Sequence, residues 1–329
     1  MKRVLLLAAV LSGAALAAPL KVGLVTDIGG LNDHGFNQLA YQGLLRAEKT
    51  LGITGSVVQS QAQSDYVPNL SNFARNGYNL VIAVGYLMQD AVERVSKEFP
   101  NTKFLIIDSA ITNRKNVTSA IFSTQECGYL VGALAGLVEK DKALKLPGLA
   151  HNNIIGVVGG ISIPPVNTYI AGYYQGAMAT DPNIKILRGY TGNFNDPAAG
   201  KQLTLAQHSQ GADIVFMDAG GTGLGGIQAA KQGNFYAIGV DTDQAYLAPH
   251  HVLTSAVKGV NTSVYDTIAA LTKGKFRPGI STFDLQNHGV GIGTILSSVP
   301  AKFKAEIAKL AAEIASGKIK VSPNIPKTN

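Results

Sequence analysis

The sequence predicts an α/β protein made of two lobes, each a doubly wound parallel sheet. The first observation is an internal repeat, because residues 21–25 resemble 154–158, and residues 41–43 and 174–176 both read Tyr-Gln-Gly. The second is that short apolar runs alternate with segments of helical spacing in both halves, as in successive βαβ units. Crossovers between parallel strands are right-handed, and strands that read as continuous apolar runs imply that helices cover both faces of each sheet.

The apolar runs are continuous rather than alternating, which is typical of strands buried on both faces. In the first half they include residues 79–82 and 104–108, and their counterparts in the second half are residues 213–216 and 237–241. In open parallel sheets, ligands bind outside the carboxyl ends of the strands. Two such sheets with facing strand ends would therefore enclose a cleft.

The predicted division of the chain has two lobes joined by a hinge with three crossings. The first lobe is expected over residues 18–124 and 254–280, and the second over 125–253 and 281–329. In this division the strand at residues 252–257 already returns to the first lobe. Several crossings side by side allow the lobes to close while limiting their twist.

The first 17 residues have the pattern of a secretory signal peptide. Lys2 and Arg3 precede an apolar run, and small residues at 15–18 suit a cleavage site. The run is shorter than the roughly 20 apolar residues that a membrane helix needs. We therefore expect a secreted, periplasmic protein, and one without a lipid anchor because no cysteine follows the cleavage site.

Composition argues against several other classes of protein. Cys127 is the only cysteine, so no intramolecular disulfide is expected. The net charge of +7 is scattered and forms no basic stripe interleaved with aromatic residues, which argues against nucleic-acid binding. The histidines show no metal-ligand spacing, and neither a nucleophile elbow nor a P-loop is present. We expect no metal, no cofactor and no catalytic residues.

One glycine pattern imitates a dinucleotide-binding fingerprint. Gly221, Gly223 and Gly226 fit G-x-G-x-x-G after a strand, and Asp241 follows about 20 residues later. However, the pattern lies in the second half, and the matching position of the first half reads Gly85-Tyr86. An exported protein also rarely meets free NAD, so we do not expect nicotinamide chemistry.

The loop after the first strand carries candidate ligand-binding residues. Asp27 opens it, and Phe36 and Asn37 lie at the start of the next helix, where they could offer a flat apolar face and an amide. Its glycines would allow close approach of the backbone to a ligand. The alternative is that Phe36 anchors the core and Asp27 merely completes a turn.

Asp108 and Asp241 are the strongest candidates, because the repeat places both at the carboxyl end of equivalent strands. Carboxylates there could accept hydrogen bonds from hydroxyls or ring N–H groups, or could serve as an acid and a base as in glycosidases. Gly220 and Gly221 lie in a loop that would expose its backbone after another strand. Lys258 follows the strand at the predicted crossing, although an isolated lysine is usually a solvated surface group.

Four segments resemble the basic membrane protein (BMP) family of ABC-transporter substrate-binding proteins, of the purine nucleoside receptor A type. The segments are residues 26–30, 35–38, 238–244 and 254–258. The resemblance covers nearly all of the chain after residue 17. It implies the type I periplasmic-binding-protein fold, a monomeric protein, and delivery of nucleosides to an ABC permease.

The resemblance also implies roles for individual residues at the base of a nucleoside. Phe36 would stack on the base while Asn37 and Asp108 bond to its edge. A second aromatic residue should cover the other face of the base. The candidates for it are Phe216, Tyr86 and Phe194.

At the sugar, the resemblance implies that Asp241 and Lys258 hold the ribose hydroxyls. Asp27 and the backbone of residues 220–223 would complete the site. Many family members are lipoproteins, whereas this sequence lacks the acylated cysteine. The loops at residues 86 and 217–218 do not match the family pattern clearly, which leaves the preferred base open.

The expected function is capture of a purine nucleoside, of the adenosine, guanosine or inosine class, by closure of the two lobes. One alternative is a binding protein of the same fold for a sugar or another polar metabolite. The other is an exported nucleoside hydrolase that uses Asp108 and Asp241 as its acid and base.

Overall fold

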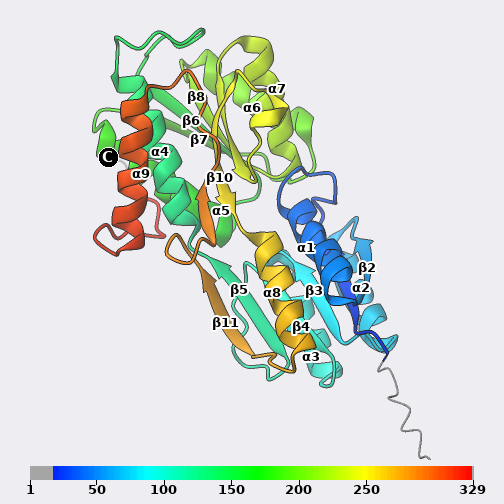
Figure 1. Cartoon of the computed structure of the whole chain (residues 1–329). Helices are drawn as coiled ribbons and strands as arrows, with labels where there is room; N and C mark the ends of the chain where they lie inside the picture. Colours follow the sequence, from blue (N-terminus) through cyan, green and yellow to red (C-terminus); the bar gives the residue numbers. More distant parts are fainter. Residues whose placement is uncertain (1–17, 328–329) are drawn as a thin grey trace, which may run out of the picture.

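The computed structural model describes residues 18–327, which form two α/β lobes, one above the other in Figure 1. The predicted signal peptide, residues 1–17, lies outside the described residues. Each lobe is built on one six-stranded sheet. Within residues 18–327, no helix combines the length and the apolar character needed to cross a membrane.

The first sheet is buried between two pairs of helices. Its strands are β1 (Lys21–Thr26), β2 (Thr54–Gln59), β3 (Leu80–Val84), β4 (Lys103–Ile107), β5 (Val117–Phe122) and β11 (Gly279–Phe283). Its helices are α1 (Phe36–Leu51), α2 (Tyr66–Arg75), α3 (Gln89–Glu98) and α8 (Val260–Thr272). Apolar residues of α1 and α8 pack on one face of the sheet, and those of α2 and α3 on the other. This explains why the strands read as continuous apolar runs.

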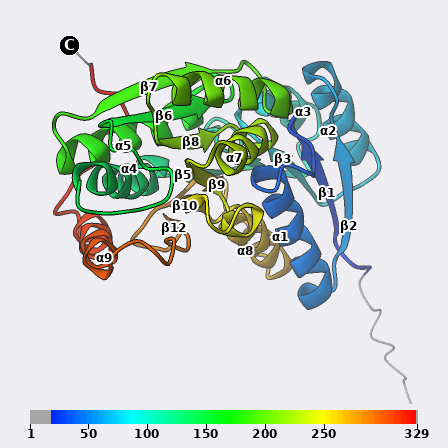
Figure 2. The same cartoon turned by 90° about the horizontal axis from the view of Figure 1, so that it is seen from above.

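The second sheet has the same construction. Its strands are β6 (Ile154–Gly159), β7 (Lys185–Tyr190), β8 (Ile214–Asp218), β9 (Tyr236–Asp241), β10 (Val252–Lys258) and β12 (Val290–Ile292). Its helices are α4 (Thr124–Lys140), α5 (Pro164–Thr180), α6 (Pro197–Ser209), α7 (Gly221–Gly233) and α9 (Ala301–Ala315). The view from above shows α4, α5 and α9 to one side of this sheet and α6 and α7 to the other (Figure 2).

The strand orders of the two sheets reveal the internal repeat. They are β11-β5-β4-β3-β1-β2 and β12-β10-β9-β8-β6-β7, and every pairing is parallel except that of β10 with β12. The strands from β1 to β5 therefore have the same spatial order as those from β6 to β10. The predicted fold class, two doubly wound parallel sheets, is confirmed.

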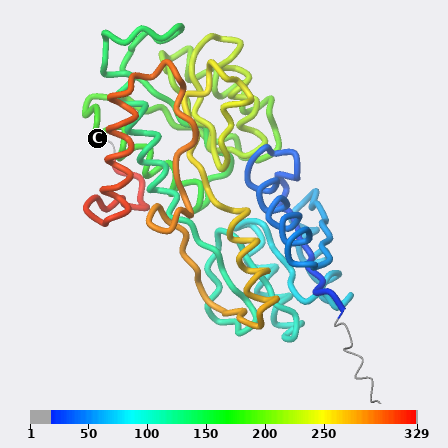
Figure 3. The backbone as a smooth tube through the Cα atoms, in the orientation of Figure 1, coloured from blue at the N-terminus to red at the C-terminus, as the bar shows by residue number. Residues whose placement is uncertain are grey.

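Three connections pass between the lobes close to one another in the tube trace (Figure 3). The first joins β5 to α4, the second joins β10 to α8 at Gly259, and the third joins β11 to β12. They are bonded together, because Ser123 N donates to Phe283 O at 2.8 Å and Gly259 N donates to Gly289 O at 2.8 Å. The rings of Phe122 and Phe283 also stack, with their centroids 4.9 Å apart.

Two of the crossings lie later in the sequence than predicted. The strand expected to return to the first lobe at residues 252–257 is β10, which pairs with β9 of the second sheet as far as Val257. β10 is the last parallel strand of the second repeat, so its buried residues complete that sheet before the chain crosses. Similarly, β11 continues to Phe283, beyond the expected boundary at residue 280, because it pairs with β5.

Candidate functional site

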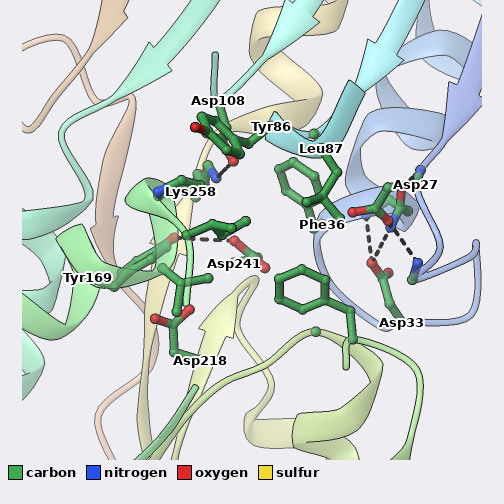
Figure 4. Close-up of a pocket in the computed structure, with 18 residues that line it drawn as sticks. Asp27, Asp33, Phe36, Tyr86, Leu87, Asp108, Tyr169, Asp218, Asp241 and Lys258 are labelled. Carbon is green, nitrogen blue, oxygen red and sulfur yellow. Dashed lines mark hydrogen bonds and ion pairs between the residues drawn. The ribbon is translucent and has the colours of Figure 1, made fainter. Parts of the chain in front are cut away.

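A pocket of about 560 Å³, counting its open mouth, lies between the two lobes. Its walls come from the carboxyl ends of strands in both sheets and from the loops that follow them (Figure 4). This is the position at which open parallel sheets bind ligands.

Asp108 and Asp241 occupy equivalent positions in the two repeats, directly after β4 and at the end of β9, and both line the pocket. Both have left-handed backbones, with φ angles of 65° and 64°. Non-glycine residues seldom adopt this conformation, and it occurs often at functional sites. The two carboxyl groups thus reach one pocket from opposite lobes, as the repeat predicted.

Lys258 is buried at the end of β10, with only 3 % of its surface exposed. Its Nζ lies 2.5 Å from Asp108 Oδ2, and the rings of Phe36 and Phe122 lie 4.5 and 5.0 Å from it. The carboxylate and the aromatic faces together stabilise this ammonium group away from bulk water. Lys258 is therefore not a solvated surface lysine.

The loop after β1 forms a network of hydrogen bonds around Asp27 and Asn37. Asn37 Nδ2 donates to Asp27 Oδ1 at 2.8 Å, and Gly29 N donates to the same oxygen at 2.9 Å. Asp33 accepts hydrogen bonds from the backbone N–H groups of Asn37 and Gln38 at the start of α1. This network fixes the amide of Asn37 and the carboxyl of Asp27, both of which line the pocket.

Phe36 begins α1, is half-buried, and lines the pocket on the first-lobe side. It packs partly against the core and lies close to Gly85, where an added Cβ would be 3.4 Å from the ring. The structure therefore gives Phe36 both a packing role and a place in the pocket wall, and its contact with a ligand stays a prediction. One side of the side chain anchors the loop, and the rest is available to a ligand.

The structure divides the three candidates for a second stacking aromatic residue. Phe194 and Tyr86 line the pocket, and Phe194 reaches the first lobe, since its Cβ lies 3.7 Å from a Cβ placed on Gly29. Phe216 does not line the pocket. It is fully buried within β8 and packs against the rings of Tyr169 and Tyr173, so the structure places its side chain in the core of the second lobe.

The two glycines predicted as ligand-binding residues, Gly220 and Gly221, differ in their position relative to the pocket. Gly220 lines the pocket and has a φ of 54°, which glycine adopts without strain. Gly221 does not line the pocket. It begins α7 and faces the other lobe, because a Cβ placed on it would lie 3.7 Å from Asp33 Cα.

Two polar residues of the pocket were not among the predicted site residues. Tyr169, on α5, donates a hydrogen bond from its hydroxyl to Asp241 Oδ1 at 3.2 Å. Asp218, the last residue of β8, lines the same part of the pocket. Its position at a strand end was a signal in the sequence, whereas no sequence pattern marked Tyr169.

The pocket is rich in carboxyl groups and contains one basic side chain. Asp27, Asp33, Asp108, Asp218 and Asp241 line it, and Lys258 is the one lysine or arginine among the lining residues that the structure describes. Burial raises the pKa of Asp27 to about 6 and that of Asp241 to about 7. Burial also raises the pKa of Asp218 well above its usual range. Such a site suits a neutral, polar ligand and disfavours an anion.

The lobes touch each other at the mouth of the pocket. Gln244 Nε2 of the second lobe donates to His34 O of the first at 3.0 Å, and Tyr246 Oη lies 2.9 Å from His34 Nδ1. A Cβ placed on Gly35 would lie 3.5 Å from Asp241 Oδ2. The structure therefore shows the lobes in a closed arrangement around the pocket.

The geometry limits the chemistry that the pocket can perform. Asp108 is held by Lys258, so it is not a free partner for Asp241 in acid–base catalysis. Between residues 18 and 327, no three histidine, cysteine or acidic side chains gather in a way that could hold a metal ion.

Comparison with known proteins assigns the chain to a family. Residues 20–325 match the Bmp family, described as "ABC transporter substrate-binding protein PnrA-like". The ABC transporter nucleoside-binding protein BmpA of Lactococcus lactis is 36% identical, over 92% of this chain and 89% of that protein. An uncharacterized lipoprotein of Pyrococcus horikoshii is 33% identical, over 90% of this chain and 73% of that protein.

Among solved structures, an ABC transporter solute-binding protein from Aeropyrum pernix K1 has the same fold. Its TM-score is 0.84 at 27% identity, over 92% of this chain and 93% of that chain. These matches agree with the two-lobed architecture and with a ligand pocket between the lobes. The chain belongs to the Bmp family of PnrA-like substrate-binding proteins of ABC transporters.

Proposed function

We propose that this protein captures a purine nucleoside in the interlobe pocket and delivers it to an ABC permease. The observation that carries the proposal is that a single pocket has two chemically different ends. One end combines Phe36 with the fixed polar groups of Asp27 and Asn37. The other end combines Asp241 with Lys258, and Asp108, for which the resemblance implied a bond to the edge of the base, is paired with Lys258 there.

The first end suits a flat ring that bears nitrogen atoms. Phe36 offers an aromatic surface, and stacking on a base contributes about 1–3 kcal/mol. Asn37 can both donate and accept hydrogen bonds, and Asp27 can accept them from ring N–H or amino groups. Phe194 and Tyr86, which line the same pocket, are the candidates for the opposite face of the ring.

The second end suits the hydroxyl groups of a sugar. Asp241 has one oxygen bonded to Tyr169, which orients the carboxyl group. Lys258 donates hydrogen bonds, and Gly220 brings the backbone to the pocket wall without a side chain. Charged partners of this kind bind neighbouring hydroxyls strongly when water is excluded. The nucleoside-binding description of the Lactococcus lactis relative supports the same ligand class.

Calorimetric titration of the ligand-free protein tests this proposal. We expect inosine, guanosine or adenosine to bind with a submicromolar dissociation constant, which corresponds to about −9 kcal/mol. Ribose alone and the free base should bind much more weakly, because each occupies only one end. Equal affinity for ribose and the nucleoside would instead identify a sugar-binding protein, and binding of neither would refute the proposal.

The protein acts by binding and not by hydrolysis in this proposal. Its relatives are substrate-binding proteins, and Asp108 is engaged by Lys258 instead of being poised for proton transfer. Incubation with the bound nucleoside, followed by chromatography, should recover it intact. Release of free base at many equivalents per protein would establish a hydrolase.

Closure of the lobes is the signal to the permease in this proposal. A ligand favours the closed form only if it contacts both lobes, as a nucleoside spanning Phe36 and Asp241 would. The protein would work as a monomer, which light scattering with and without ligand would measure.

We place this activity outside the cytoplasm, in a periplasm. The support is the pattern of residues 1–17 together with membership of an importer family. The intact mass of the protein recovered from its host would show whether these residues are removed. The same mass would test the expectation that no lipid is attached.

A further inference from the structure

Asp218 differs from the other acidic residues of the pocket because its carboxyl group has no hydrogen bond or ion pair with any other described residue. It ends β8, only 5 % of its surface is exposed, and it lines the pocket. Its Oδ2 is buried and has no hydrogen-bond partner anywhere in the described residues. The backbone around it is fixed, because Gly160 N donates to Asp218 O at 2.9 Å.

The other pocket carboxyl groups are all engaged by the protein. Each accepts at least one hydrogen bond or ion pair from a neighbouring group: Asp27, Asp33, Asp108 and Asp241. A buried polar group without a partner is costly, so such groups are rare in native structures and call for an explanation. Asp218 Oδ2 is closed off within the pocket wall, so Oδ1, which also has no partner among the described residues, is the oxygen that a ligand in the pocket can meet.

The position of Asp218 identifies which part of a ligand it would meet. In the close-up it lies on the same side of the pocket as Tyr169 and Lys258, while Asp27 and Asp33 lie beyond Phe36 (Figure 4). Asp241 lies between these groups. Asp218 therefore belongs to the end that, under the proposed function, receives the sugar.

The charges at this end favour a neutral partner. Three carboxyl groups meet one ammonium group there, and the ammonium of Lys258 is already paired with Asp108. An additional anion would be repelled, whereas a hydroxyl group can both donate to and accept from a carboxyl group. A hydroxyl therefore satisfies Asp218 whether or not the carboxyl carries its proton.

We infer that Asp218 is a further ligand-binding residue, which bonds one hydroxyl group of the sugar and so selects ligands that carry it. This inference rests on the proposed function and extends it to a residue at the end of β8. A site built to bond a hydroxyl rejects an analogue without it, because the buried group then stays unpaired. The raised pKa of the Asp218 carboxyl, caused by burial and by the nearby Asp241, agrees with a group that lacks its partner here.

A comparison of deoxynucleosides with Asp218→Ala tests the inference. The wild-type protein and the variant are titrated with the best-bound nucleoside and with its 2′-, 3′- and 5′-deoxy forms. We expect Asp218→Ala to weaken the parent nucleoside by at least about fivefold. For one deoxy form, the two proteins should bind with equal affinity, because the hydroxyl that Asp218 bonds is absent.

Two further variants separate this effect from loss of folding. Asp218→Asn keeps the shape and can still bond a hydroxyl, so it should restore most of the affinity for the parent nucleoside. Glu306→Gln changes a carboxyl group on α9 of the same lobe that pairs only with the exposed Lys309 and does not line the pocket, and this variant should bind every ligand as the wild type does. If Asp218→Ala weakens the parent and all three deoxy forms equally, or weakens none, the inference is wrong.

The outcome also distinguishes this inference from the proposed function. If the protein binds ribose but no nucleoside, the proposed function is wrong, while the same comparison with deoxyriboses still decides the role of Asp218. If the protein binds neither ribose nor any nucleoside, both fail.

Discussion

Phe36 combines an aromatic surface with a position at the end of the pocket that is proposed to receive the base. We predict that Phe36→Ala lowers the affinity for purine nucleosides by about ten- to a hundredfold, since stacking on a base contributes about 1–3 kcal/mol. Free ribose should lose less than about threefold, because it does not need the ring. Calorimetric titration of both ligands measures the difference.

The matched control for this prediction is Phe276→Ala. Phe276 is a half-buried phenylalanine of the first lobe that lies outside the interlobe pocket, beside Lys103. It should leave both affinities unchanged. If Phe36→Ala weakens the affinity for the nucleoside and for ribose equally, stacking on Phe36 does not contribute to nucleoside binding.

Asp241 makes the complementary prediction at the sugar end. Asp241→Ala should weaken nucleosides by about ten- to a hundredfold, the range for hydrogen bonds to charged groups, and should leave the free base much less affected. Asp266→Ala, an exposed carboxyl group on α8, is the control. If the titrations show no change in nucleoside affinity, Asp241 has only a structural role.

Among single residues, the sequence predicted the position in the pocket best for those that the internal repeat also constrained. Asp108 and Asp241 could be placed because each ends an equivalent strand. Phe216 was misplaced because β8 is buried on both faces, so apolar character does not reveal which way a side chain points. Phe194 lies in a loop between β7 and α6, and no periodicity in the sequence fixes the path of such a loop.

The helix pair α4 and α5 positions the sugar end of the pocket, because α5 carries Tyr169. The two helices pack with their backbones in close contact through glycines. A Cβ on Gly132 would lie 2.1 Å from Tyr173 O, and one on Gly176 would lie 1.9 Å from Tyr129 O. In each case the added Cβ would meet a main-chain carbonyl oxygen of the other helix. Relieving the overlap therefore requires one helix to move.

We predict that Gly132→Ala destabilises the protein by about 1–3 kcal/mol, the usual cost of an extra methyl group in a packed core. It should also weaken ligand binding, because a shift of α5 displaces Tyr169 from Asp241. Gly291→Ala is the control, since a Cβ there meets nothing within 4 Å. Chemical denaturation measures the stability of both variants, and an unchanged midpoint for Gly132→Ala would contradict the packing argument.

The order of the elements was predictable, but their assignment to lobes was not in every case. The apolar runs predicted from the sequence correspond to β1, β3 and β4 in the first repeat and to β6, β8, β9 and β10 in the second. For β10 and β11, however, the sheet that each strand joins depends on which neighbouring strand it pairs with in the folded protein. That is a property of the assembled sheets, and a single sequence does not display it.

In the closed arrangement, the whole molecule brings buried carboxyl groups from both lobes into one pocket. Asp241 of the second lobe is covered by Gly35 of the first, and Asp27 faces the same pocket. In the closed form their pKa values are about 7 and about 6. In an open form water reaches both groups, so their pKa values should return toward about 4.

Closure of the ligand-free protein should therefore depend on pH. The closed form has the higher pKa values, so it binds more protons than the open form between about pH 4 and 7. Closure is favoured below that range and becomes less favourable as the pH rises through 7. Four other charged groups face the pocket: Asp33, Asp108, Asp218 and Lys258. After burial, Lys258 lowers the pKa of Asp241, whereas Asp33 and Asp108 raise it.

Small-angle X-ray scattering tests this prediction. The radius of gyration of the ligand-free protein should be smaller at pH 5 than at pH 8, whereas saturating nucleoside should give the small value at both, because its contacts with both lobes outweigh the cost of burying the carboxylates. The double variant Asp27→Asn and Asp241→Asn cannot ionise at these two positions and should lose most of the pH dependence. An equal change in the variant and the wild type would assign the effect to other groups, and no change in the wild type would show that these carboxyl groups do not oppose closure.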